Sequence, residues 1–221
     1  MSLTFPNESP AYRQARDALL EAEVTLRAQI EQVAEQRRAL PPGGVVKEDY
    51  EFTELRDEGR IRPVKLSELF GAHDSLFLYS FMYGPDAEQP CPMCSSLLDA
   101  LNGNAPHILL RTGFAVVARS PIERVAEFAT QRGWRHLRIV SSHANSYNSD
   151  YFAEDADGDQ MPMANVFVRG DGGIHHFWGT ELFYADVPGH PRHMDLMWPL
   201  WNLFDTTPQG RGEDWFPPLN V

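Results

Sequence analysis

The chain has 221 residues, of which 43% are apolar and 11% aromatic, enough to bury the core of a globular protein. Its net charge of −12 repels phosphate backbones and anionic lipid surfaces, so we expect neither a nucleic-acid partner nor a membrane partner. The first residues, MSLTFPNESP, have no basic flank before an apolar run, and no later run approaches the length of a membrane span. The sequence therefore indicates a cytoplasmic protein.

The first predicted element is a long helix from Ser9 to Leu40. Ser9 can cap its first turn, Pro10 suits the first helical position, and the run PPGG at 41–44 ends it. The helix carries one apolar stripe, which consists of Leu19, Leu26, Val33 and Leu40 with Ala15, Ala22 and Ile30 alongside. This stripe fits two interpretations, packing on its own domain or pairing in a homodimer.

After the helix, short apolar runs typical of buried strands alternate with helical segments. The predicted strands are 75–83, 114–119, 137–141, 163–168 and 174–178. Three helices are predicted among these strands. The first begins near Cys91 and ends near Leu101, and the last runs from about Arg192 to Phe204. The second runs from Pro121 to Arg132, with Ser120 as its cap and Gly133 as its stop. The sequence RGDGG joins the last two strands and is a hairpin signal.

This order of elements predicts an α/β fold. Strand–helix–strand units imply a parallel part of the sheet, and the hairpin adds antiparallel strands at one edge. We therefore expect a mixed central sheet flanked by helices, preceded by the long N-terminal helix. The predicted division is a helical arm over residues 1–44 and a second domain over residues 45–221, which includes a C-terminal helix and tail.

The two cysteines of the chain, Cys91 and Cys94, lie one helical turn apart after the first buried strand. Cys91 directly precedes Pro92, so it is expected at the start of the helix, where unpaired N–H groups stabilise a thiolate. In this arrangement Cys91 can attack a disulfide and Cys94 can resolve the mixed disulfide. A CxxC after a strand in a βαβ chain favours redox chemistry.

Two other interpretations of the pair stay open. A structural zinc site needs four ligands, and the sequence contains no second CxxC, so histidines would have to complete it. An inert pair of core cysteines is the other interpretation. We favour redox chemistry and therefore expect no bound metal and no bound cofactor, because the electrons come from another thiol system.

The segment from Lys65 to Trp178 resembles the thioredoxin fold, with CPMC at 91–94 in the place of its active-site motif. Met161 and Pro162 stand directly before a strand that ends in a Gly turn, and this resembles the cis-proline position of the fold. The resemblance implies that Pro162, with Met161 and Pro92, shapes a substrate groove beside the nucleophilic cysteine.

The whole chain is similar to an uncharacterised bacterial thioredoxin-like family related to the AhpC/TSA peroxidase group. The motifs that carry this resemblance are Arg37-Arg38 with Leu40-Pro41, FMYGP, CPMCS, RSP, RGW and DTTPQGRGEDW. The chain departs from peroxiredoxins because no Ser or Thr stands between Pro85 and Cys91. It departs from thioredoxins because the strand at 75–83 contains no acid.

We therefore predict a thiol–disulfide oxidoreductase in which Cys91 is the nucleophile and Cys94 the resolving thiol. A peroxiredoxin-like thiol peroxidase is the first alternative, with Cys91 oxidised to a sulfenic acid. A binding protein whose CxxC holds zinc or nothing is the second. The expected partners are a protein or small-molecule thiol, disulfide or peroxide.

Overall fold

The computed structural model describes residues 3–56, 59–188, 192 and 194–220. It divides into two compact units, Met1–Pro41 and Pro42–Val221. None of the helices in these described ranges combines the length and apolar character that crossing a membrane requires.

The first unit consists of the helix α1 (Pro10–Arg38) and its flanks. Ser9 caps it as predicted, because its hydroxyl oxygen accepts a hydrogen bond from the Tyr12 N–H at 3.1 Å. Arg13 and Asp17 form an ion pair one turn apart, at 3.1 Å. The predicted long N-terminal helix is confirmed.

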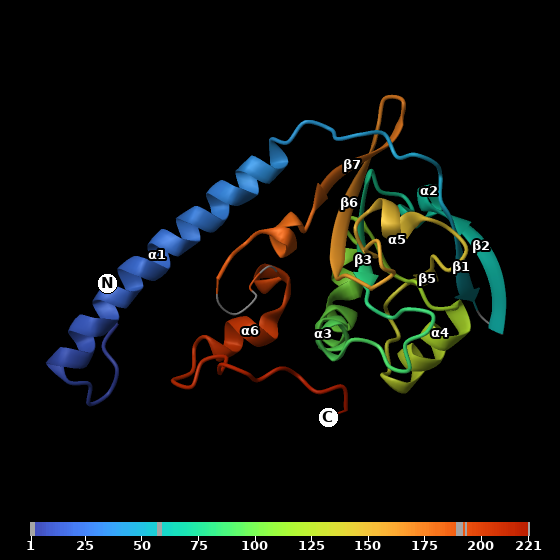
Figure 1. Cartoon of the computed structure of the whole chain (residues 1–221). Coiled ribbons are helices and arrows are strands. Elements are labelled where there is room, and N and C mark those ends of the chain that lie inside the picture. The colour runs from blue at the N-terminus through green and yellow to red at the C-terminus, as the bar shows by residue number, and fades with distance from the viewer. Residues whose placement is uncertain (1–2, 57–58, 189–191, 193, 221) are drawn as a thin grey trace. The chain divides into compact units, whose positions relative to one another are not determined.

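The second unit is built on one seven-stranded sheet with the order β2-β1-β5-β4-β3-β6-β7 (Figure 1). The strands are β1 (Glu51–Arg56), β2 (Arg60–Lys65), β3 (Ser75–Phe81), β4 (Gly113–Ala118), β5 (Ile139–Ser141), β6 (Met163–Gly170) and β7 (Gly173–Gly179). β3, β4 and β5 are parallel, whereas β1, β2, β6 and β7 pair antiparallel. The mixed sheet and its βαβ core make this the predicted thioredoxin-like α/β fold.

Helices cover both faces of the sheet and enclose two apolar cores. The helices of this unit are α2 (Leu66–Leu69), α3 (Pro92–Ile108), α4 (Ile122–Gln131), α5 (Tyr147–Asp150) and α6 (Pro199–Phe204). Successive residues of β3 point to opposite faces, as the pleat requires. Tyr79 packs with residues of α3, α4 and α6, and Leu78 packs with residues of α2 and α5. The start of α3 therefore lies over the Tyr79 face of β3.

Some predicted boundaries were wrong. The last helix begins at Pro199 and not at Arg192, because the proline keeps Trp198 extended and only a 3-10 turn, Asp195–Met197, precedes it. His193 of the predicted helix lies outside the described residues. Ser120 does not cap α4: Pro121 is its N-cap, and the Ser120 hydroxyl donates to the Gly84 carbonyl at 2.7 Å.

Candidate active site

Cys91 lies where β3 leads into α3. It is the N-cap of the helix, Pro92 takes the first helical position, and the Cys91 N–H donates to the Met82 carbonyl at 3.0 Å. The backbone N–H of Cys94 points back at the Cys91 sulfur, with N and Sγ 3.5 Å apart. A thiolate at this position therefore meets N–H groups that the helix leaves unpaired.

The two thiols differ in access to solvent. Both are free, but Cys91 is half-buried and Cys94 is buried, with 3% of its surface exposed. The Ser95 hydroxyl donates to the Cys91 carbonyl at 2.9 Å, which ties the first turn together. An incoming disulfide can therefore reach the Cys91 sulfur, whereas the Cys94 sulfur is buried in the core.

The same geometry separates the acidities of the two thiols. A hydrogen bond from the Cys94 thiol lowers the pKa of Cys91 to about 6, and the N–H groups of Cys94 and Met93 add to this effect against the cost of burial. The pKa of Cys94 is raised well above its ordinary value, because its thiol is the donor in that bond and because it is buried. At neutral pH this arrangement favours a thiolate on Cys91 and a thiol on Cys94.

This arrangement predicts the pH profile of alkylation. The rate at which iodoacetamide modifies Cys91 should rise with pH, reach half of its plateau near pH 6, and stay flat above pH 7, because only the thiolate reacts. In Cys94→Ala the midpoint should move up toward about 8.5, the value of a free cysteine, because the donor is lost. Mass spectrometry of the modified protein measures both; a midpoint near 8.5 in the unchanged chain would contradict the assignment.

Tyr79 is a site residue that sequence reasoning took for core. Its side chain lies on the α3 face of β3, is 1% exposed, and its hydroxyl hydrogen-bonds the Cys94 thiol. Burial, then the proximity of Cys94, raises the pKa of Tyr79 well above its ordinary value, so it stays protonated. Because this bond lowers the pKa of Cys94, Tyr79 acts as a donor that favours the Cys94 thiolate. The Tyr79 hydroxyl thus lies beside the buried cysteine of the pair, on a strand that contains no Asp or Glu.

Tyr79→Phe should therefore slow the second step of disulfide exchange more than the first. A hydrogen bond to a charged group contributes about 1.5–3 kcal/mol, so attack by Cys94 should slow by about tenfold or more. Quenching the reaction by alkylation at set times separates the mixed disulfide from the final product. Tyr83→Phe removes another hydroxyl from the same apolar core and should leave both phases unchanged. Equal phases in Tyr79→Phe and the unchanged chain would remove Tyr79 from the site.

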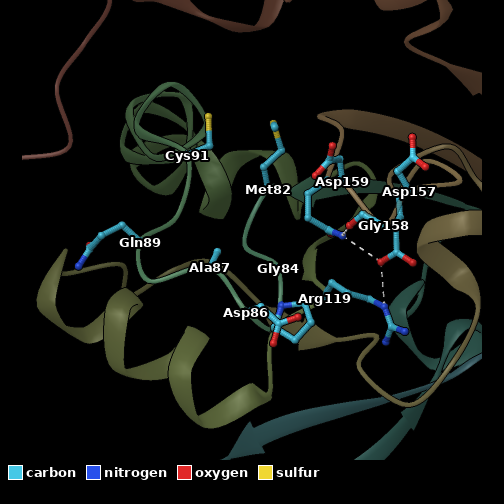
Figure 2. Close-up of a pocket in the computed structure, with 13 residues that line it drawn as sticks. Met82, Gly84, Asp86, Ala87, Gln89, Cys91, Arg119, Asp157, Gly158 and Asp159 are labelled. Carbon is cyan, nitrogen blue, oxygen red and sulfur yellow. Dashed lines mark hydrogen bonds and ion pairs between the residues drawn. The ribbon is translucent and has the colours of Figure 1, made fainter.

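A pocket of about 800 Å³ opens beside Cys91 (Figure 2). Its lining residues come from the loop before α3, from the end of β4 and from the loop before β6: Met82, Gly84, Pro85, Asp86, Ala87, Gln89, Cys91, Arg119, Glu154, Asp157, Gly158, Asp159 and Gln160. Arg119 pairs with Glu154 at 3.0 Å, and the Gln160 amide donates to the same carboxylate at 2.9 Å. The pocket has the size of a small-molecule site.

Residues 2–220 match a family described as a bacterial protein of unknown function, DUF899. The chain belongs to this family. The match covers nearly the full length and confirms the family resemblance that CPMCS and the other motifs indicated. A search of curated proteins finds no match for this DUF899 chain.

Several solved structures are similar to the chain. The mitochondrial 2-Cys peroxiredoxin of Plasmodium falciparum is 14% identical, with 73% of this chain and 95% of that one covered and a TM-score of 0.46. Peroxidoxin BcpB of Mycobacterium tuberculosis is 21% identical over 61% and 82%, with a TM-score of 0.41. Peroxiredoxin Q of Xanthomonas campestris is 15% identical over 62% and 84%, with a TM-score of 0.43. Similarities this distant say nothing about activity.

The prediction of a cis-proline was wrong: the Met161–Pro162 peptide bond is trans. The loop before β6 is held by its own backbone bonds, since the Met161 N–H donates to the Ala153 carbonyl at 2.9 Å and Glu154 pairs with Gln160 as an antiparallel bridge. The chain thus enters β6 without a tight turn at the proline, and the trans form is the more stable one by about 0.5–1 kcal/mol.

None of the predicted groove residues Pro92, Met161 and Pro162 lines the pocket beside Cys91. Pro92 follows Cys91 at the start of α3. Met161 and Pro162 precede Met163, which pairs with Ser80 near the end of β3. The residues of the loop before β6 that line the pocket are Glu154, Asp157, Gly158, Asp159 and Gln160. Within the described ranges, no three His, Cys, Asp or Glu side chains gather so as to hold a metal ion.

Proposed function

We propose that this DUF899 chain is a thiol–disulfide oxidoreductase with Cys91 as nucleophile and Cys94 as resolving thiol. The observation that carries the proposal is the asymmetry of the pair. Cys91 is half-buried, opens on the pocket and has a pKa near 6, whereas Cys94 is buried one turn behind it. This is the order in which attack and resolution need the two sulfurs.

The proposed reaction balances in two steps. The Cys91 thiolate attacks one sulfur of a disulfide R–S–S–R, forms Cys91–S–S–R, and releases R–S⁻, which takes up a proton. Cys94 then loses its proton, attacks the Cys91 sulfur, and releases the second R–S⁻. The substrate gains two electrons, and the pair is left as a Cys91–Cys94 disulfide. A dithiol reductant returns two electrons to this disulfide and completes the cycle.

Tyr79 and the helix start assist different steps. The N–H groups of Met93 and Cys94 stabilise the Cys91 thiolate, both before attack and as a leaving group. The Tyr79 hydroxyl stabilises the Cys94 thiolate as it forms in the second step. Pro92, Met161 and Pro162 belong to the proposed substrate groove, where Pro92 shapes the first turn and the other two form the entry to β6.

The experiment that tests this proposal is the redox equilibrium of the pair in glutathione buffers, measured by alkylation and mass. We expect a reversible disulfide with a potential between about −120 and −270 mV, the range of working oxidoreductases. A pair that stays reduced over this range would contradict the proposal, and so would one that reacts only after a chelator is added. Rapid consumption of peroxide with weak disulfide exchange would favour a thiol peroxidase instead.

A further inference from the structure

The pocket beside Cys91 carries an unbalanced negative charge. Asp86 lies on the loop before the cysteine, and Asp157 and Asp159 lie on the loop across the pocket, as Figure 2 shows. All three residues are exposed. Over the described residues, no Lys, Arg or His forms an ion pair with any of them.

Arg119, the cation among the lining residues, does not offset these carboxylates. Arg119 lines the pocket, but its Nε pairs with the Glu154 carboxylate at 3.0 Å. Its terminal nitrogen donates to the Ser142 carbonyl at 2.9 Å and also to the His143 carbonyl. Glu154 and Arg119 cancel in charge. Arg124 donates to the carbonyls of Pro85 and Ala87 on either side of Asp86, so its single charge offsets at most one of the three aspartates and the pocket keeps a net negative charge.

The loop that carries Asp157 and Asp159 is built by its backbone and by Asp155. The Asp155 carboxylate accepts the N–H groups of Asp157 and Asp159 at 3.0 and 2.9 Å, and the Asp155 N–H donates to the Asp159 carbonyl at 3.0 Å. The carboxylates of Asp157 and Asp159 are thus available to the pocket, and their replacement by amides should leave the loop intact.

We propose that the site selects disulfides whose sulfurs are flanked by positively charged groups, such as the ammonium groups of a small aminothiol. The inference rests on the proposed function and adds the substrate class. A pocket lined by charge of one sign raises the local concentration of the opposite ion and speeds association by about 10–10³-fold. The negative charge of the pocket repels glutathione disulfide, which is anionic at neutral pH, and should slow its association.

Three alkyl disulfides of similar size test the proposal: cystamine with two ammonium groups, bis(2-hydroxyethyl) disulfide without charge, and 3,3′-dithiodipropionate with two carboxylates. Each rate with the reduced full-length chain is divided by the rate of the same disulfide with dithiothreitol, which removes the intrinsic reactivity of the compound. At low ionic strength the normalised rates should fall in that order, with about 30-fold between the extremes. Half-molar salt should compress the difference to about threefold.

Asp157→Asn with Asp159→Asn should reduce the ratio of the normalised cystamine rate to the normalised dithiodipropionate rate by about tenfold. The matched control is Glu48→Gln with Asp171→Asn, which changes the net charge equally at exposed positions outside the pocket. A control that reduces the spread as much as the pocket variant would assign the effect to the charge of the whole chain and overturn the proposal.

The failures of the two proposals can be told apart. If all three disulfides oxidise the pair at equal normalised rates, the charge preference is wrong and the oxidoreductase stands. If none of the three disulfides oxidises the pair, both proposals are wrong. Short disulfide-linked peptides with Lys or Glu beside the cysteine distinguish two kinds of cationic substrate. If the Lys peptide reacts faster than the Glu peptide, the substrate class includes basic peptide segments. If cystamine is fast and the two peptides react at equal rates, the substrate class is small aminothiols.

Discussion

Cys94→Ser should trap the substrate on the protein. When the reduced variant meets bis(2-hydroxyethyl) disulfide, Cys91 should keep one half of the molecule as a stable mixed disulfide, because no thiol stands behind it to release the second half. Intact-protein mass spectrometry should show one added mercaptoethanol group per chain. Turnover of the disulfide with a dithiol reductant should fall by at least about 10³-fold, because resolution then depends on the reductant alone.

The matched variant is Cys91→Ser, which should carry no adduct and should also lose turnover. A serine hydroxyl is not ionised at neutral pH, and the remaining Cys94 is buried, with a pKa above its ordinary value. Equal adducts on the two variants would contradict the assignment of roles, since each sulfur would then be a nucleophile. An adduct on Cys91→Ser alone would reverse it.

Local signals explain why the position of Cys91 was predictable. A nearly continuous apolar run predicts β3, the following proline predicts the first helical position, and the cysteine between them must be the N-cap. The hairpin of β6 and β7 was predictable for the same reason, since RGDGG permits the left-handed backbone that Gly172 and Gly173 adopt. These features depend on neighbours in the chain.

Features that depend on distant residues could not be predicted in this way. Tyr79 looks like any aromatic residue of a buried strand, and only the packing of α3 on β3 brings its hydroxyl to Cys94. Asp157 and Asp159 look like a solvated acidic loop, and only the return of that loop to the end of β3 makes them a wall of the pocket. The role of Tyr79 and that of the two aspartates can therefore be inferred only once the fold is known.

The missed strands β1 and β2 show the same limit. The sequence EFTELR of β1 lacks a regular alternation of apolar and polar residues, because the buried side of the strand carries Phe52 and then a charged residue, Glu54, which is 2% exposed. Three arginines neutralise it: Arg56 on the same strand, Arg62 on β2 and Arg138 just before β5. Charged residues are seldom buried without a partner, and the partners of Glu54 lie up to 84 residues away in the chain. The residues next to Glu54 in the sequence therefore could not predict that its carboxylate is buried.

Glu54→Gln should therefore lower the free energy of unfolding by about 2 kcal/mol at pH 7, since the buried carboxylate loses its charged hydrogen bonds with Arg138 and Arg62, whose own side chains are partly exposed to water. The carboxylate accepts from Arg138 at 2.9 Å and from Arg62 at 3.0 Å, and an amide can replace only one of its two acceptor oxygens. Urea unfolding followed by tryptophan fluorescence measures the change. Glu51→Gln, at an exposed position of the same strand, should change it by less than about 0.5 kcal/mol.

The pH dependence of this loss identifies its cause. Burial by itself raises the pKa of Glu54, but the hydrogen bonds and charge of Arg138, with the charge of Arg56, bring it below its ordinary value. A carboxylate with a lowered pKa in the folded state stabilises the protein above its unfolded pKa of about 4.3. That contribution disappears as the pH falls through the folded pKa. The difference between the unchanged chain and Glu54→Gln should thus be constant from pH 6 to 8 and shrink below about pH 4; a loss that stays constant to pH 3 would mean that packing, and not charge, holds β1 in place.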